Sequence, residues 1–377
     1  MSFPLRIERR LRQPWWLSAA VPVGSLVVAF CVIALVLLAT HHPVGHTFTR
    51  LLSSAFGSRR ALESTFVSAT PLAFTGLCAA VAFRMNLFNI GGEGQLYAGA
   101  VTGAGAALLL GGGVPRPVSI AAMIVAGAAG GALFALIPGV LRAFFSTNEI
   151  IVSLMLNYVA ALGLDYLIFD SLSYWRDTST PDARVFPQGK QLPDAATWPG
   201  AHLGLLVPLG FLVALAIAAV VHVLYARTRF GFEVRVIGDS PRAAAYAGMR
   251  TRRKILAVMA LSGAIAGVGG ASQDGDFRHV LDPKGLSQAG YGYTGIVIAA
   301  LARYNPYAVC AIAFLLGGLQ NAGYTLQGAD FPSGLVGVMQ GLILFCVLGA
   351  ELLVRYRVTL DRSRRRAGPA APVEAAP

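Results

Sequence analysis

Long apolar runs recur along the whole 377-residue chain, and this repetition constrains the fold more than any other feature of the sequence. A helix needs roughly 20 consecutive apolar residues to cross the hydrocarbon layer of a bilayer. The runs are continuous rather than alternating, which favours membrane helices over the strands of a barrel. Charged residues make up only 13% of the chain, about half of the roughly 25% usual in soluble domains. The sequence therefore predicts an all-α membrane protein.

About ten segments are predicted to cross the membrane. Their approximate ranges are 16–39, 62–84, 88–110, 118–142, 150–170, 202–225, 255–271, 289–303, 307–323 and 333–355. The second to fifth and the seventh to tenth segments form two four-helix blocks that enter the membrane from opposite sides. This arrangement is typical of an inverted repeat, although the two blocks share no convincing sequence identity.

The basic residues orient the chain. With an even number of spans, 21 of the 30 Lys and Arg residues fall on the side of the N-terminus. The positive-inside rule makes that side cytoplasmic. We expect a cytoplasmic N-terminus at 1–15, a transmembrane domain at 16–358 and a disordered cytoplasmic tail at 359–377. The net charge of +12 then reflects topology, and no nucleic-acid binding is predicted.

Two polar stretches interrupt the apolar pattern. Residues 171–201 are rich in Pro, Asp and aromatic residues and are predicted to be periplasmic. Their Tyr and Trp side chains, among them Trp175 and Trp198, would suit anchoring at the membrane interface. Residues 226–254 are basic and are predicted to be cytoplasmic.

A broken stretch is predicted at residues 83–100, where polar and Gly residues separate two apolar runs. Gly lets the backbone leave the helix, and the freed peptide groups then need polar partners. Such stretches often line a passage, and an ionisable residue at membrane depth indicates function. The alternative is an ordinary cytoplasmic turn with a solvated Glu93. The polar side chains concerned are Asn86, Asn89, Glu93 and Gln95.

A short capped helix is predicted within the basic stretch. Ser240 is a good N-cap, Pro241 fits the first helical position, and Gly248 suits a left-handed C-cap. The helix between them has fewer than two turns and would be unstable alone in water. It is either a docking element that a partner supports or a linker helix that lies along the membrane surface.

Other polar and small residues fall inside the apolar runs. Ser146 and Glu149 have capping-box spacing, so Glu149 is interpreted as structural. Small-residue pairs four apart would let helices approach closely, though Gly is common in membrane helices generally. These pairs are Gly99/Gly103, Gly127/Gly131, Gly263/Gly267 and Gly337/Gly341.

Three motifs in order carry a family resemblance: FNIGGEGQ (88–95), NEIIVSLMLNY (148–158) and GFEVRVIGDSPRAAAYAGM (231–249). Together they resemble the permease subunits of ABC importers for nucleosides and simple sugars, closest to the longer of two nucleoside permeases. The resemblance covers roughly residues 60–355. It implies uptake by alternating access in a bacterial inner membrane, with nucleosides as the first substrate class and simple sugars as the alternative.

The resemblance also implies partners and site residues. The short helix would be a coupling helix that contacts a separate ATP-binding subunit, which would bind ATP and Mg. Its contact residues are Ser240, Pro241, Arg242, Ala243, Ala244, Tyr246 and Gly248, with Arg242 where the general importer pattern has Glu. A second permease subunit, as a heterodimer or a homodimer, and an extracytoplasmic binding lipoprotein would complete the assembly. Arg176 and Arg184 would dock the lipoprotein.

Asn, Gln and Tyr in the apolar runs suit a nucleoside, because amides match base and ribose groups without net charge and Tyr can stack on a base. The same side chains could instead join helices. The predicted substrate pathway comprises Asn86, Asn89, Glu93, Gln95, Asn157, Tyr158, Gln288, Tyr291, Gln320 and Asn321, with Tyr293 nearby.

Several motifs are missing from the sequence. It has no phosphate-binding GxxxxGK[ST] loop and no HExxH, GxSxG or CxxC motif, so no enzyme, metal site or cofactor of its own is predicted. A secondary transporter with Glu93 or Asp165 as its coupling carboxylate remains as the alternative from another class; an intramembrane enzyme is disfavoured.

Overall fold

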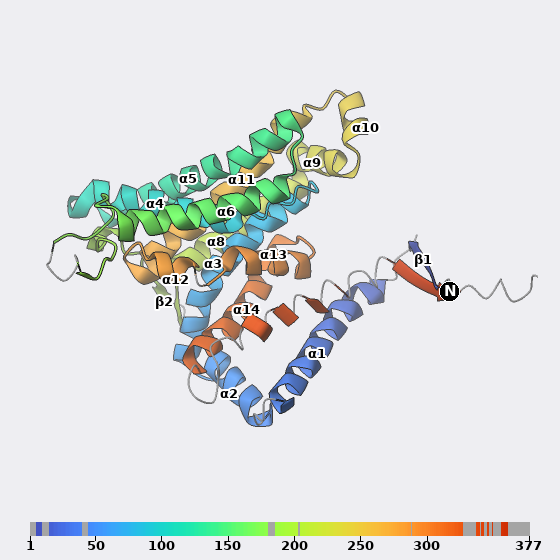
Figure 1. Ribbon diagram of the computed structural model, residues 1–377, viewed down its shortest axis with the longest axis horizontal. Coiled ribbons are helices and arrows are strands. Elements are labelled where there is room, and N and C mark those ends of the chain that lie inside the picture. The colour runs from blue at the N-terminus through green and yellow to red at the C-terminus, as the bar shows by residue number, and fades with distance from the viewer. Residues whose placement is uncertain are drawn as a thin grey trace, which may run out of the picture. The chain divides into compact units, whose positions relative to one another are not determined.

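The computed structural model describes residues 5–9, 15–39, 44–179, 185–202, 204–287 and 289–326, with short pieces at 337–339, 341–342, 345–346, 349 and 356–360. The chain divides into two compact units. The larger is Gly45–Val336, and the smaller combines Met1–Val44 with Gly337–Pro377. Helices dominate both, which confirms the predicted all-α class (Figure 1).

Seven helices among the described residues are long and apolar enough to cross a membrane. They are α3 (Arg59–Phe83), α4 (Gly92–Leu110), α5 (Arg116–Phe145), α6 (Glu149–Asp165), α8 (Leu209–Arg227), α11 (Thr251–Ser272) and α14 (Pro306–Leu326). Turns named η1 (Gly111–Gly113), η2 (Tyr166–Asp170) and η4 (Gln273–Arg278) extend α4, α6 and α11. Most of the tenth predicted segment, 333–355, lies outside the described residues, so the count of ten stays a prediction.

Helix α3 forms the centre of the larger unit. Every residue from Ala69 to Phe83 is buried, including the large side chains of Leu72, Phe74 and Leu77. A helix that is apolar on all sides is stable only when other elements cover all of it. Here α8, α11, α13 and α14 pack around α3.

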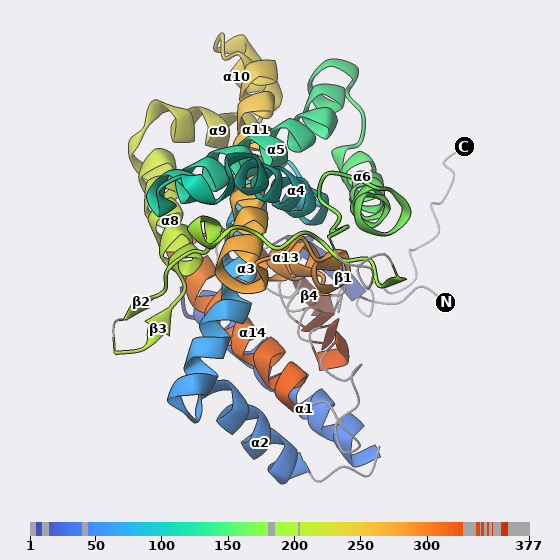
Figure 2. The ribbon, with the colours of Figure 1, turned by 90° about the vertical axis from the view of Figure 1, so that its left-hand side faces the viewer.

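Helices α4, α5 and α11 pack together (Figure 2), and their contacts include glycines. A Cβ atom on Gly267 of α11 would lie 2.0 Å from the carbonyl oxygen of Gly127 on α5. One on Gly99 of α4 would lie 2.2 Å from the Cα of Gly267, and one on Gly131 the same distance from the carbonyl oxygen of Gly263. The predicted close approach therefore holds for three of the four small-residue pairs. At the fourth, Gly337 and Gly341, nothing described lies within 4 Å.

Two predicted spans are shorter than expected. The segment expected at 88–110 is helical only from Gly92, because residues 84–91 form a loop. The segment expected at 289–303 is helical in α13 (Tyr291–Leu301), and the short helix α12 (Pro283–Ser287) precedes it. With 11 residues, α13 is about 16 Å long, about half the thickness of the hydrocarbon layer.

The basic stretch 226–254 contains two helices where one was predicted. Residues 226–227 end α8 and residues 251–254 begin α11. Between them lie α9 (Arg229–Asp239) and α10 (Pro241–Tyr246), together at one end of the larger unit (Figure 1). Val234 and Ile237 bury one face of α9. An amphipathic helix that was not predicted, α2 (Val44–Phe56), precedes α3.

The polar stretch 171–201 packs against the other ends of the helices. It contains η3 (Asp194–Ala196) and leads into the strands β2 (Ala201–His202) and β3 (Leu206–Val207). The Trp175 indole donates to the carbonyl oxygen of Val101 (2.9 Å), and the Trp198 backbone N–H donates to that of Gly275 (2.9 Å). Trp198 is 3% exposed, so the predicted anchoring at the membrane interface is wrong for this residue.

The smaller unit contains α1 (Trp15–Ala39) and an antiparallel strand pair. Strand β1 (Leu5–Arg9) pairs with β4 (Tyr356–Leu360) in a register that runs from Leu5↔Leu360 to Arg9↔Tyr356. Both strands alternate apolar and polar residues, the period of a strand. The pairing includes Thr359 and Leu360, which were predicted to belong to the disordered tail. A two-stranded pair has open edges and therefore lies outside the hydrocarbon layer.

Candidate functional site

Two amides join the loop 84–91 to the helices around it. Asn89 Nδ2 donates to Gln95 Oε1 (2.9 Å), and Gln95 Nε2 donates back to Asn89 Oδ1 (2.9 Å). Asn89 Nδ2 also donates to Ser262 Oγ on α11 (2.9 Å). Asn89 Oδ1 further accepts the backbone N–H of Gly91 (3.0 Å). Each amide side chain is 1% exposed, so these bonds replace the water that the freed backbone would otherwise need.

Glu93 links the first turn of α4 to the first turn of α13. One carboxylate oxygen accepts the hydroxyl of Tyr97 (2.5 Å) and the other accepts the backbone N–H of Gly292. A Cβ on Gly292 would lie 2.3 Å from the Glu93 nitrogen, so this approach requires glycine. Glu93 is 3% exposed. The alternative of a solvated cytoplasmic turn is therefore wrong.

Asn157 brings α6 into the same network. Its Oδ1 accepts the backbone N–H of Gly94 (2.9 Å), and its Nδ2 donates to the carbonyl oxygen of Ile90 (3.0 Å). A longer contact of 3.5 Å joins Nδ2 to the hydroxyl of Tyr293 on α13. We call Asn89, Glu93, Gln95 and Asn157 the buried polar network.

The network lies at membrane depth. Ser262 is 11 residues along α11 from Thr251, which corresponds to about 16 Å at the rise of an α-helix. Asn157 is 8 residues along α6 from Glu149, or about 12 Å. The loop 84–91 therefore enters the helix bundle at Asn89, whereas Asn86 and Phe88 remain exposed.

Two tyrosines next to the network face outward. Tyr158, which follows Asn157 on α6, is 60% exposed, and Tyr293, whose hydroxyl approaches Asn157, is 41% exposed. Tyr291, by contrast, is 6% exposed. The network therefore borders a surface that offers two aromatic rings with their neutral hydroxyls.

Gln320 and Asn321 on α14 lie apart from this network. Asn321 Nδ2 donates to the carbonyl oxygens of Ser54 and Ala61 and to Thr65 Oγ1, at 3.2–3.3 Å. Asn321 thereby joins α14 to α2 and α3. Gln320 Nε2 contacts the hydroxyl of Tyr324 (3.5 Å), while Gln320 Oε1 has no hydrogen-bond partner among the described residues.

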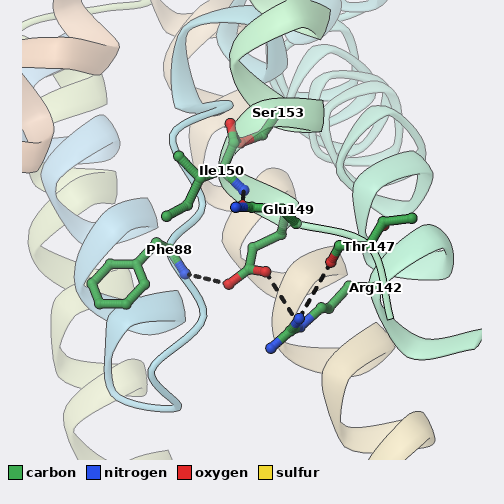
Figure 3. A network of polar contacts seen from close by, with 7 residues as sticks. Phe88, Arg142, Thr147, Glu149, Ile150 and Ser153 are labelled. Carbon is green, nitrogen blue, oxygen red and sulfur yellow. Dashed lines mark hydrogen bonds and ion pairs between the residues drawn. The ribbon is translucent and has the colours of Figure 1, made fainter. Parts of the chain in front are cut away.

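Glu149 fixes the start of α6, as Figure 3 shows. Its carboxylate accepts the backbone N–H of Phe88 (3.3 Å) and pairs with Arg142 Nε (3.3 Å). The structural interpretation of Glu149 is thus confirmed. The capping box is wrong, however, because Asn148 caps α6 by accepting from the Ile150 N–H, whereas Ser146 ends α5 with φ +55°.

The caps predicted for the short helix are confirmed. Ser240 Oγ accepts the backbone N–H of Ala243 (3.3 Å), and Pro241 takes the first position of α10. Gly248 has φ +74°, and its N–H donates to the carbonyl oxygen of Ala245 (3.0 Å) in a Schellman-type end. Within α10, Ala244 is fully buried and Tyr246 is 99% exposed. Arg242 and Ala243 are exposed as well.

The α9–α10 arm (residues 229–248) is attached to the loop 84–91. Asn86 Nδ2 donates to the carbonyl oxygen of Gly238 near the end of α9 (2.8 Å). A Cβ on Gly238 would lie 3.1 Å from the Arg84 carbonyl oxygen, so the two backbones are close. Arg84 in turn donates to the carbonyl oxygen of Tyr304, after α13 (2.9 Å). The loop thus contacts the arm at Asn86 and the buried polar network at Asn89.

An ion-paired cluster joins the arm to α11. Glu233 pairs with Lys254 (2.7 Å) and with Arg229 (2.9 Å). The hydrogen bond from Lys254, with help from Arg229, lowers the pKa of the Glu233 carboxyl below its ordinary value.

Of the two arginines predicted to dock the lipoprotein, Arg176 lies within the described residues. Arg176 donates to the carbonyl oxygens of Phe169 (3.2 Å) and Ser171 (3.3 Å) and is half-buried. Arg184 lies outside the described residues, as does Gln288 of the predicted pathway.

Four positions in this site were not predicted: Tyr97, Ser262, Gly292 and Gly238. The only local signal for any of them is Gly292 between two tyrosines at a segment start, and the other three become functional candidates only through contacts between distant parts of the chain.

A family model described as branched-chain amino acid transport system / permease component matches residues 61–348. The chain belongs to this permease family. Membership makes the protein a permease subunit of an ABC importer and disfavours the ion-gradient carrier.

Relatives of this permease cover most of its length. It is 34% identical to the glucose ABC transporter permease protein TsgB13 of Haloferax volcanii, over all of this chain and 98% of that one. It is 32% identical to the guanosine ABC transporter permease protein NupP of Bacillus subtilis, over 87% of this chain and 92% of the relative. Identity to the nucleoside ABC transporter permease protein NupB of Lactococcus lactis is 27%, over 87% and 90%.

Proposed function

We propose that this permease imports nucleosides, with simple sugars as the alternative substrate class. The observation that carries the proposal is the exposed pair Tyr158 and Tyr293 beside the amide of Asn157. A nucleoside base needs an aromatic face and neutral hydrogen-bonding groups, and the rings and hydroxyls of these two tyrosines offer both. The similarity to a guanosine and a nucleoside permease supports this choice, and the similarity to a glucose permease keeps the alternative.

In this proposal the predicted pathway residues take two roles. Tyr158 and Tyr293 contact the solute. The exposed Asn86 and the buried residues Asn89, Glu93, Gln95, Asn157 and Tyr291 hold the broken helices that border the route. Asn321 joins helices, whereas Gln288 and Gln320 remain candidates for the pathway.

The α9–α10 arm would transmit the work of ATP hydrolysis. We place a separate ATP-binding subunit, carrying ATP and Mg, against the exposed surface of α10, with Tyr246 at the centre of the contact. When that subunit closes on ATP, it would move α10, and the Asn86–Gly238 hydrogen bond would carry the motion to the loop 84–91. Closely packed helices favour discrete states, so the motion would switch the route between inward-open and outward-open.

The assembly would include two further proteins. A second permease subunit, related or identical, would complete the route. An extracytoplasmic lipoprotein would deliver the solute to the stretch 171–201, with Arg176 and Arg184 as docking cations. Tight packing of this stretch on the ends of α4 and η4 supports a docking role, because it holds the surface in one shape.

We place the protein in a bacterial inner membrane with both termini in the cytoplasm. The pairing of β1 with β4 supports termini on the same side, because paired strands cannot be separated by a bilayer. The 21 basic residues on that side support the cytoplasmic assignment.

Substrate competition tests the solute class. Uptake of labelled nucleoside is measured with unlabelled nucleosides, pentoses or glucose as competitors; competition by nucleosides alone is expected. Tyr158→Phe, which keeps the ring, should retain uptake, and Tyr158→Ala should lose most of it. Tyr166→Ala is the matched control, because Tyr166 is equally exposed about two turns further on, at the start of η2. Competition by sugars alone would contradict the nucleoside assignment.

Assembly tests the docking role. Ala243→Arg adds bulk and charge on the exposed side of α10 and should abolish co-purification with the ATPase while membrane insertion stays normal. Tyr246→Ala should weaken co-purification. Unchanged assembly and transport in both variants would contradict the role of α10.

A further inference from the structure

A cavity of about 620 Å³ lies between the α9–α10 arm and the start of α11. Its wall combines four cations, one carboxylate and several apolar side chains. The charged and aromatic residues of this wall are Arg229, Phe230, Phe232, Glu233, Arg250, Arg253 and Lys254.

The cations of this cavity outnumber its carboxylate. Glu233 is shared by Arg229 and Lys254, so that cluster carries one net positive charge. Arg250 and Arg253 are exposed, and within the described residues neither has an acidic group within 4 Å. The first turn of α11 holds no acidic residue, and no side chain caps it. Its free N–H groups therefore add to the positive potential around the cavity.

The depth of the cavity indicates what kind of anion reaches it. Helix α11 with η4 has 28 residues, about 42 Å, which exceeds the roughly 30 Å hydrocarbon layer by about two turns, or about one turn at each end. The first turn of α11, with Arg253 and Lys254, therefore lies at the level of the lipid headgroups. Phe230 and the 54% exposed Phe232 supply an apolar wall beside the cations.

We propose that this cavity binds the phosphate headgroup of an anionic phospholipid. The phosphate would lie between Arg250, Arg253 and the start of α11, and the glycerol and upper acyl chain against Phe232. A lipid bound there would hold the arm against α11 and so control its motion. This regulatory consequence rests on the proposed function of the arm, whereas the lipid site itself does not.

Lipid retention by the purified permease tests the site. Arg250→Gln/Arg253→Gln removes the two unpaired cations from the cavity wall. Arg252→Gln/Arg303→Gln removes the same charge from exposed positions outside it. Native mass spectrometry compares retained phosphatidylglycerol and phosphatidylcholine, after circular dichroism shows that both variants fold.

The cavity variant should bind phosphatidylglycerol about thirtyfold more weakly, about fivefold per cation, while the control changes little. Phosphatidylcholine retention should be low in all three proteins. Equal losses in the cavity and control variants would show only surface attraction and overturn the site. Millimolar inorganic phosphate should not replace the lipid; full replacement would overturn the lipid assignment.

The regulatory part has a separate readout. In the assembled transporter, phosphatidylglycerol nanodiscs should give ATP hydrolysis that differs at least threefold from that in phosphatidylcholine nanodiscs, and the cavity variant should abolish the difference. Unaltered lipid dependence would overturn the regulation while leaving the lipid site to the retention measurement. A cavity variant that keeps phosphatidylglycerol but loses the ATPase would show that the cavity is a subunit contact and overturn the proposal. Loss of lipid with normal assembly would leave the proposed function intact.

Discussion

Gly267→Ala should destabilise the permease, although alanine is the better helix former. The new Cβ would lie 2.0 Å from the carbonyl oxygen of Gly127 and 3.0 Å from the Cα of Gly131. Ordinary contact begins near 3.4 Å, so α5 and α11 would have to separate by about 1.4 Å. Because the opposing atoms belong to the backbone, no change of rotamer relieves the overlap.

The expected magnitude combines two opposing terms. Overpacking of a close contact costs about 1–3 kcal/mol, and this overlap belongs at the upper end. Replacing Gly by Ala within a helix stabilises the helix by up to about 1 kcal/mol. The net loss in the free energy of unfolding should therefore be about 2 kcal/mol.

Gly163→Ala is the matched control, because Gly163 lies in α6 with nothing within 4 Å of the new Cβ. It should be neutral or stabilise by up to about 1 kcal/mol. Both variants are unfolded by titration with SDS in mixed micelles and followed by circular dichroism. The two variants should differ by about 2–3 kcal/mol in the free energy of unfolding. A Gly267→Ala protein as stable as the control would refute the inferred helix contact.

Substitutions at three further contacts provide other tests. Arg142→Ala should lower the free energy of unfolding by about 1–3 kcal/mol more than Glu149→Gln does, because it leaves the Glu149 carboxylate, which is 7% exposed, without its cation. Equal losses in thermal unfolding would contradict the pairing in Figure 3. Asn86→Gly keeps the left-handed backbone (φ +53°) but removes the hydrogen bond to Gly238. ATP hydrolysis by the assembled transporter should therefore persist while transport falls severalfold. Equal losses of ATP hydrolysis and transport would argue against transmission through this bond. Glu233→Gln should reduce stability at neutral pH but not in acid. The lowered pKa means that the native carboxyl binds fewer protons, so its contribution is present above the ordinary pKa of about 4.3 and is lost as pH falls through the native value. Unfolding at several pH values measures the difference in the free energy of unfolding between the wild type and Glu233→Gln, and this difference should vanish in acid.

Local signals in the sequence sufficed for some elements. The caps of α10 depend on Ser240, Pro241 and Gly248, which lie within nine positions of one another, so their chemistry could be recognised without the fold. Long spans such as α5 were predicted correctly, because a run of about 20 apolar residues is typical of a membrane helix and of few other structures.

Contacts between residues far apart in the chain could not be predicted from the sequence. Glu93 and Gly292 are 199 positions apart, and Asn89 and Ser262 are 173 apart. The sequence identified Asn89 and Glu93 as unusual but could not decide whether water or protein would surround them. The short helix α12 was not predicted, because its five residues include Lys284 and Ser287 and form no apolar run.

The strand pair at the chain ends affects the order of biosynthesis. Leu5 leaves the ribosome about 350 residues before its partner Leu360, a delay of roughly 20 to 70 s at ordinary translation rates. During that interval the first strand has no partner from its own chain, and its unpaired edge is open to other chains or to chaperones. Completion of the pair would therefore be a late event that reports on arrival of the last membrane segment.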